Sequence, residues 1–434
     1  VDAVKAEGTK GNWAHHITLE NNYIINHGNN QQIVGISTKC SAWNWVIRGN
    51  TIIGAGTGLY LGNSTGEAPF VAGLIENNLV MNTVGYNMEI KHQLDTVRDN
   101  FSGTANDNQT TIIRYNVWSK ASNASTGANA RPVVLLGALP GTGFGSNDHY
   151  EVYGNFFYEN PVEALIQVTG NTALYSNVFV NHQDPGTRTV YITSQNGFSP
   201  RSISVFHNTV LSNSSTGGIR LYNPNTGFSQ YCYANAAFST SSPISGFTND
   251  VNNIPDTYAN AGNYINSAST TLSSLDLYPK SGQLQGTSTS SSLFQSFTDW
   301  DKDFNRTTYN WTYRGAYSGS GTNPGWHLQL AIMTTPGTIT GINNNSAIND
   351  FLGMVYPNPA NNSFDLDLDL EENTNIKILI TNPEGQVLKT VCSGDMPSGK
   401  NKITVNAQEL ASGFYLLSAQ FKDRIITRKF LISK

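Results

Sequence analysis

The residues best suited to chemistry in this chain lie in the stretch Asn87-Met88-Glu89-Ile90-Lys91. If this stretch is a strand, Asn87, Glu89 and Lys91 share one face, because side chains alternate between the two faces of a strand. Such a set could bind a polar molecule, and proton abstraction would need one of its groups within hydrogen-bond reach of the proton. The simpler alternative is that Glu89 and Lys91 form a neighbouring ion pair on a sheet surface.

Similar strand-like stretches recur along the chain, at 33–37, 58–61, 87–91, 131–135, 165–168, 190–193 and 219–222. If their aliphatic residues point inward, a row of polar and aromatic residues points outward. The candidate substrate-binding residues of this row are Tyr60, Gln167, Tyr191, Arg220 and Tyr222, and its other members are Ser37, Asn87, Glu89, Lys91, Arg131 and Thr193. Tyrosine rings stack on sugar faces and cations meet carboxylates or sulfates, so the row suits an extended polysaccharide. Because polar residues face outward on every solenoid, simple solvation of these charges is the alternative.

An asparagine that recurs between two short runs of β-forming residues indicates how these stretches are positioned. It occurs at residues 22, 50, 78, 116, 155, 177, 208 and 235, at intervals of 22 to 39 residues. A repeat of this length without helical periodicity predicts an all-β fold, a right-handed parallel β-helix with one coil per repeat. Asparagine suits the corner because it tolerates a left-handed backbone and its amide can bond to the copy one coil away. The alternative is that asparagine is merely common in loops.

The remaining organisation follows from composition and pattern. We expect a β-helix domain over 1–333, with the last coil and cap at 298–333, and a linker at 334–350. The Asp-rich turn at 299–303 could bind calcium or be a solvated turn. Residues 351–434 contain several short strands with strict alternation, as in Phe364-Asp365-Leu366-Asp367-Leu368, and predict a small antiparallel, Ig-like β-sandwich.

Charge and composition narrow the function classes. The net charge of −5 argues against a nucleic-acid partner, because a nucleic-acid-binding protein would carry a stripe of basic residues. No apolar run reaches 18 residues, so we expect no transmembrane segment. Cys40, Cys232 and Cys392 lie far apart and have no metal-binding spacing. The chain enters its first coil soon after Val1, so we expect a mature or truncated product.

The order Glu89, Lys91 and then an arginine about one coil later resembles the alginate lyase and chondroitinase B-type polysaccharide lyases, which are parallel β-helices. The resemblance implies that Lys91 takes the C5 proton of a uronate, that Arg131 assists at the leaving oxygen, and that Asn87 and Glu89 hold a calcium ion on the substrate carboxylate. The protein would then be a carbon–oxygen lyase. A non-catalytic, glycan-binding adhesin or structural β-helix is the alternative from another class. A pectin-type hydrolase would need several Asp residues on adjacent groove strands, and these stretches supply none.

The C-terminal region resembles the sorting domain of cargo for the type IX secretion system of Bacteroidetes-type bacteria. The resemblance rests on Tyr356-Pro357-Asn358-Pro359-Ala360, on Gly385, on Leu410-Ala411-Ser412-Gly413-Phe414-Tyr415-Leu416, and on the basic end with Lys429 and Lys434. It implies that 351–434 engages the secretion machinery and that the protein is secreted or held at the outer cell surface. The alternative is an ordinary carbohydrate-binding or adhesive sandwich.

Overall fold

A computed structural model of the chain describes residues 1–8, 13–98, 108–120, 122–290, 292–333, 352–370, 372–382, 386–421 and 425–434. The chain divides into two compact units, Val1–Pro336 and Gly337–Lys434. The expected linker at 334–350 and the motif residue Gly385 lie outside the described residues.

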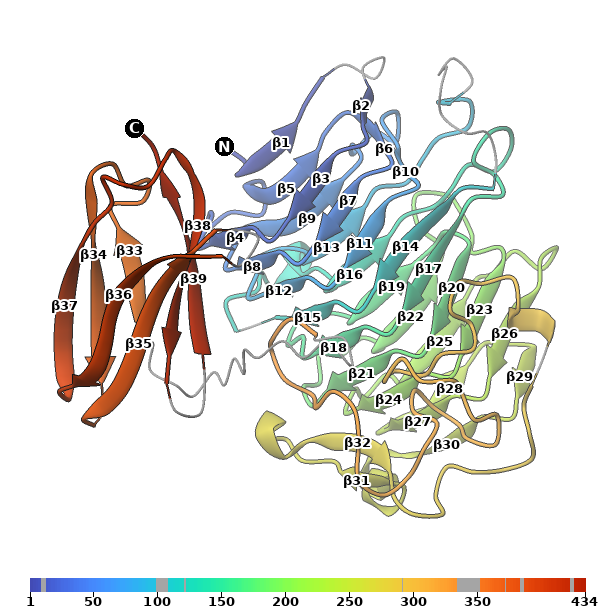
Figure 1. Ribbon diagram of the computed structural model, residues 1–434. Helices are drawn as coiled ribbons and strands as arrows, with labels where there is room; N and C mark the ends of the chain where they lie inside the picture. Colours follow the sequence, from blue (N-terminus) through green and yellow to red (C-terminus); the bar gives the residue numbers. More distant parts are fainter. Residues whose placement is uncertain are drawn as a thin grey trace. The chain divides into compact units, whose positions relative to one another are not determined.

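The first unit is a parallel β-helix, which confirms the predicted all-β fold (Figure 1). Three nine-stranded sheets run along it, each made of in-register parallel strands from successive coils. Sheet A contains β1 (Val4–Ala6), β5 (Val34–Thr38), β9 (Thr57–Leu61), β13 (Met88–Ile90), β16 (Val134–Leu136), β19 (Ile166–Val168), β22 (Val190–Thr193), β25 (Ile219–Tyr222) and β28 (Ile244–Ser245). Sheet B is short and contains β2 (Trp13–His15), β6 (Ser41–Trp43) and β10 (Phe70–Val71).

The other two long sheets complete each coil. Sheet C contains β3 (Thr18–Glu20), β7 (Val46–Arg48), β11 (Leu74–Glu76), β14 (Thr110–Arg114), β17 (His149–Tyr153), β20 (Thr172–Tyr175), β23 (Ile203–Phe206), β26 (Gln230–Tyr233) and β29 (Asn249–Val251). Sheet D contains β4 (Tyr23–Ile25), β8 (Thr51–Ile53), β12 (Leu79–Met81), β15 (Val117–Ser119), β18 (Phe156–Tyr158), β21 (Val178–Asn181), β24 (Thr209–Ser212), β27 (Ala236–Ser239) and β30 (Ile254–Thr257).

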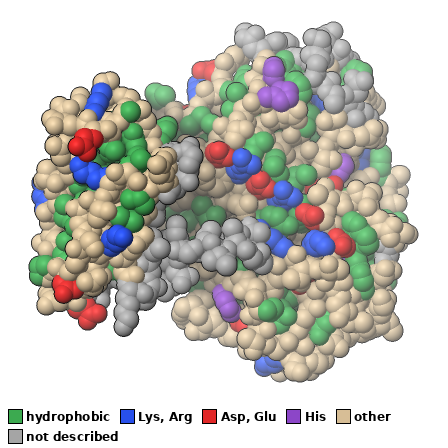
Figure 2. Space-filling model, viewed as in Figure 1, with side chains coloured by type: hydrophobic (Ala, Val, Ile, Leu, Met, Phe, Trp, Pro, Cys, Tyr) green, Lys and Arg blue, Asp and Glu red, His purple; other side chains and the backbone are tan. Residues whose placement is uncertain are grey.

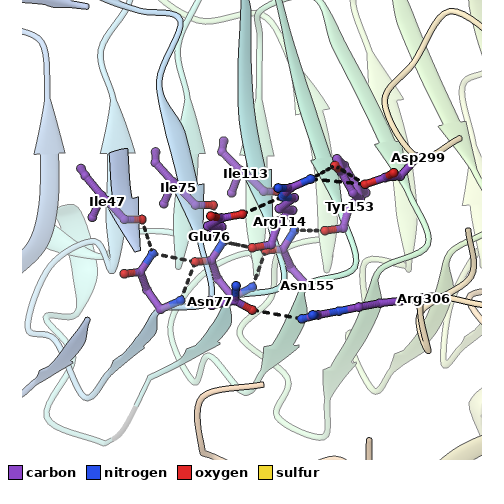
Figure 3. Close-up of polar contacts among 12 residues, drawn as sticks. Ile47, Ile75, Glu76, Asn77, Ile113, Arg114, Tyr153, Asn155, Asp299 and Arg306 are labelled. Carbon is purple, nitrogen blue, oxygen red and sulfur yellow. Dashed lines mark hydrogen bonds and ion pairs between the residues drawn. The ribbon is translucent and has the colours of Figure 1, made fainter. Parts of the chain in front are cut away.

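The eight predicted asparagines form one continuous ladder at the corner between sheets C and D. The backbone N–H and the side-chain Nδ2 of each asparagine donate to Oδ1 of the next, and Asn253 adds a ninth member. From Asn50 onward, each Nδ2 also donates to a backbone carbonyl, such as those of Ile47, Ile75 and Ile113 in Figure 3. Because a buried amide is costly unless it is hydrogen-bonded, this ladder fixes the register of the coils.

One part of the predicted reason for the asparagines is wrong. The left-handed residue at this corner is the one that precedes each ladder asparagine, as at Asn21, Gly49, Asn77, Tyr115 and Gly154. Tyr115, Ser176, His207 and Ala234 also adopt this conformation, although they lack the short amide that favours it. The ladder hydrogen bonds of each asparagine therefore stabilise the left-handed conformation of the residue before it, whatever the type of that residue.

Aliphatic and aromatic columns fill the interior of the β-helix. Ile36, Leu59, Met88, Val134 and Ile166 of sheet A are in register and are almost completely buried. Sheet D contributes an internal aromatic stack in which the Phe157 and Phe179 ring centroids are 4.6 Å apart. The alternation seen in the sequence therefore does place the aliphatics inside.

Residues 298–333, expected as the last coil and cap, form none of the strands of the three long sheets. The coils end with β30, and β31 (Ile265–Ser267) and β32 (Asp276–Pro279) follow as an antiparallel pair. The segment 292–317, here called the strap, runs back along sheet C. Asp299 accepts hydrogen bonds from Tyr153 and Arg114 (Figure 3). The Arg306 guanidinium lies 3.7 Å from the Tyr115 ring centroid.

The second unit consists of two antiparallel sheets. One contains β33 (Leu352–Tyr356), β34 (Ser363–Leu370) and β37 (Gly399–Asn406), and the other contains β35 (Thr374–Thr381), β36 (Val387–Met396), β38 (Gly413–Gln420) and β39 (Ile425–Ile432). Phe364, Leu366 and Leu368 point to one side of β34, and together with Ile378 and Ile380 of β35 they belong to one buried core. The strict alternation of the sequence thus gives β34 one solvent-exposed face and one buried face.

Candidate functional site

The outward row predicted from the sequence is a single line of cross-strand neighbours on sheet A. Tyr60 pairs with Glu89, Glu89 with Leu135, and Leu135 with Gln167. Gln167 then pairs with Tyr191, and Tyr191 with Arg220. Since neighbouring strands lie about 4.8 Å apart, the row from Tyr60 to Arg220 extends over roughly 24 Å, the length of several sugar units. The tyrosines, Gln167 and Arg220 are partly exposed along it.

Three side chains meet at the Tyr60 end of this row. The Lys91 ammonium forms an ion pair with the Glu89 carboxylate and lies 4.9 Å from the centroid of the Tyr60 ring. Glu89 is only 3% exposed, so burial raises the pKa of its carboxyl, and the charge of Lys91 acts against this shift. Burial and the Glu89 charge together raise the pKa of Tyr60 to about 12. The structure therefore brings a half-buried amine, a buried acid and an aromatic face together.

Tyr86 belongs to the same cluster, although sequence reasoning did not include it. Tyr86 lies close enough to Glu89 to act against the rise in the pKa of that carboxyl, and the Arg131 guanidinium lies 5.7 Å from the Tyr86 ring centroid. Arg131 also donates to the backbone carbonyls of Ala128 and Ala130. The charge of Arg131 also acts to lower the pKa of Glu89, so Arg131 lies near this cluster. In the sequence, Tyr86 is only an aromatic residue directly before the predicted stretch 87–91. The alternation of side chains along a strand does not predict where a residue outside the strand points.

Asn87 lies apart from this cluster. Its side chain is fully buried in the corner before β13, where Nδ2 donates to the carbonyls of Val80 and Ser119 and Oδ1 accepts from Thr83. The expected common face of Asn87, Glu89 and Lys91 is therefore wrong, because β13 begins only at Met88. Within the described residues, no group of three or more His, Cys, Asp or Glu side chains could hold a metal ion together. Because Asn87 is bonded within the corner and Glu89 is paired with Lys91, these two residues do not fit the expected calcium site.

The Asp-rich turn is likewise engaged within the fold. Asp303 accepts from Thr307 and from Ser318, and Asp301 forms an ion pair with Lys302. With Asp299 bonded to Tyr153 and Arg114, these carboxylates hold the strap in place.

Loops on one edge of sheet A form a wall beside Lys91. Asn196 and Gly197 form the tip of a tight hairpin, and the Asn196 amide lies 3.2 Å from Nδ1 of His92, the residue after Lys91. A pocket of about 320 Å³ lies on this edge, between Thr169 after β19 and the loops that carry Leu139, Phe198, Arg201 and Phe228. Tyr222 occupies this edge two strands further along, where it pairs with Thr193. The edge therefore offers aromatic rings and a guanidinium next to the row.

Comparison with known families identifies the second unit. Residues 354–433 match the family described as the secretion system C-terminal sorting domain. The second unit is a type IX secretion sorting domain. Its presence indicates that the protein is secreted or displayed at the cell surface. No curated protein and no solved structure matches the chain.

The described part of the chain contains no helix that is long and apolar enough to span a membrane.

Proposed function

We propose that the β-helix binds an extended acidic polysaccharide along the outer face of sheet A and cleaves it by β-elimination at Lys91. The observation that carries the proposal is the cluster of Tyr60, Glu89 and Lys91, which is in line with polar and aromatic side chains of types that bind saccharides, with only Leu135 between them. Gln167, Tyr191 and Arg220 extend the row to one side, and their amide, ring and cation suit uronate hydroxyls, faces and carboxylates.

The chemistry begins with a proton transfer inside the Glu89–Lys91 pair. A polymer lying over the pair removes water and disfavours both charges, and the raised pKa of Glu89 makes it the acceptor of the Lys91 proton. The neutral Lys91 amine then takes the C5 proton of a uronate. The C5 electron pair forms the C4–C5 double bond as the C4–O bond breaks, and Arg131 stabilises the leaving oxygen.

Turnover of alginate, chondroitin and pectate by the full chain tests this proposal through the ultraviolet absorbance of the unsaturated uronate product. We expect product from at least one of these polymers, and a loss of about 10²-fold or more in kcat for Lys91→Ala. Lys39→Ala is a matched control, because Lys39 also lies over the Tyr60 ring, at 5.6 Å, but is paired with Asp2. The proposal fails if no polymer yields unsaturated product, or if both variants lose activity equally.

One observation favours a second candidate, a glycan-binding surface protein without catalysis. The Glu89 carboxylate pairs with the Lys91 ammonium, and an ammonium binds carboxylates but has no free electron pair with which to act as a base. This candidate predicts retention of acidic glycans on an array without turnover. Binding would weaken when Tyr191, Arg220 or Lys91 is replaced by Ala, and no unsaturated product would form with the wild type or with any of these variants.

A further inference from the structure

Lys120, directly after β15, is a buried lysine that the saccharide row does not use. The residue is 4% exposed, and its Nζ donates to the carbonyl oxygen of Arg131 at 2.9 Å. A buried ammonium is costly unless a charge compensates it. Burial, reinforced by the charge of Arg131, lowers the pKa of Lys120 to about 7. A substantial fraction of Lys120 is therefore a neutral, nucleophilic amine at neutral pH.

Asn160, from the following coil, reaches the same carbonyl oxygen. Its side chain is fully buried, and Nδ2 donates to the carbonyls of Arg131 at 3.1 Å and Ala164 at 3.0 Å. The two nitrogens that share the Arg131 oxygen are thus no more than about 6 Å apart. The amide oxygen Oδ1 accepts from the backbone N–H of Val162 at 3.1 Å. That hydrogen bond polarises Cγ and would stabilise negative charge on Oδ1 during an attack.

Glu163 provides a carboxylate in the same corner. Its charge favours the ammonium form of Lys120, against the effect of burial, so the two groups are electrostatically coupled. Glu163 Oε1 accepts from the backbone N–H of Ala164, the residue whose carbonyl holds the Asn160 amide. An amine, a polarised amide and an acid are therefore collected at one corner between sheets D and A.

We propose that Lys120 and Asn160 form an intramolecular isopeptide bond. The Lys120 Nζ lone pair attacks Cγ of Asn160, so that an Nζ–Cγ bond forms and the Cγ–Nδ2 bond breaks. Glu163 takes a proton from Nζ and delivers it to Nδ2, which leaves as ammonia. The reaction needs no oxidant and no second reactant. It is independent of whether the β-helix acts on polysaccharides.

The bond would supply a covalent tie that the cysteines do not. Cys40, Cys232 and Cys392 are all free. The link would join the coil of β15 to the coil of β18 and close the segment from Lys120 to Asn160. Closing this segment would restrict the unfolded chain in the way a disulfide does, without depending on the redox state outside the cell.

The intact mass of the full chain, measured after denaturation, tests the proposal. We expect a mass lower by one ammonia than the sequence requires, and a branched peptide containing Lys120 and Asn160 after proteolysis. Lys120→Met and Glu163→Gln should restore the sequence mass. Asn160→Asp should give a mass lower by one water, because an aspartate side chain loses water when it forms the same bond.

Two outcomes would overturn the proposal. One is a wild-type chain at its full sequence mass. The other is an ammonia loss that persists in Lys120→Met, which would indicate cyclisation of an asparagine on its own backbone. If Lys120→Met does not fold, fragmentation of the wild-type branched peptide locates the link directly, and its absence is equally decisive.

Discussion

Sheets A and C present similar outward rows but use them in opposite ways. On sheet C, acidic and basic residues alternate through Glu20, Arg48, Glu76 and Arg114, visible as a line of charge in Figure 2. The row continues through rings at Tyr153, Tyr175, Phe206 and Tyr233. The strap covers these rings, so Phe206 stacks on Phe294 at 4.0 Å and is fully buried. On sheet A the corresponding rings, Tyr60 and Tyr191, stay partly exposed.

This difference shows that outward aromatic residues do not by themselves indicate a ligand site. Both rows obey the same alternation, and both look like grooves for a polymer when only the strands are considered. On sheet C the chain provides its own occupant, and the ring faces are used for packing. On sheet A the rings remain available to an outside molecule, which is the reason to place the saccharide there.

The largest difference between the two sheets is expected when one aromatic ring is removed from each and the free energy of unfolding is measured. Phe206→Ala leaves a cavity between Tyr175 and Phe294, and we expect a loss of about 3–5 kcal/mol in the free energy of unfolding. Tyr191→Ala removes a partly exposed ring and should cost less than about 1 kcal/mol. Denaturant midpoints of the β-helix transition measure both. Similar losses at the two positions would mean that sheet A also has a covering segment.

A smaller effect is expected from the two arginines of sheet C. Arg114 bonds to Glu76, Tyr153 and Asp299, so Arg114→Met leaves partly buried acceptors unpaired and should cost about 2 kcal/mol. Arg48 pairs with Glu20 where both side chains are about half exposed, so Arg48→Met should cost less than about 0.5 kcal/mol. Added salt should shrink only the Arg48 effect. Equal costs would show that the strap does not shield Arg114.

The sequence predicts much of this architecture and misses what lies between its repeats. One asparagine per coil sufficed to predict the ladder, and alternation placed Tyr60, Glu89 and Arg220 in one line, because both signals repeat at fixed positions in each coil. Alternation fails one residue before β13, where Asn87 turns into the corner and Tyr86 reaches Glu89. The strap has no periodicity, and Asp299 meets Arg114 across 185 residues. Only packing in three dimensions reveals such contacts.

The smallest expected effect is on the pH dependence of stability, to which one buried glutamate of each sheet contributes: Glu89 on sheet A and Glu151 on sheet C. Burial raises the pKa of Glu89 on sheet A, so the folded state keeps a proton that the unfolded chain releases. Its contribution therefore lowers the free energy of unfolding as pH rises from the ordinary glutamate value through the raised one. On sheet C burial acts on Glu151 too, but hydrogen bonds from His149 and Thr298 outweigh it and leave the pKa lowered. Glu151 therefore stabilises the fold at pH values above the ordinary glutamate pKa. This stabilisation is lost as the pH falls through the lowered pKa of Glu151.

We expect Glu89→Gln and Glu151→Gln to change the slope of stability against pH in opposite directions. Each change should amount to about 1 kcal/mol or less, above roughly pH 4 for Glu89→Gln and below roughly pH 5 for Glu151→Gln, read from urea midpoints of each variant and the wild type. The double variant should show nearly additive slopes, because the two carboxylates lie on different sheets and share no bonding partner. Slopes of the same sign would contradict the assignment of Glu89 as a carboxyl that gives up its charge on burial. The proton transfer proposed for the Glu89–Lys91 pair would then lose its acceptor.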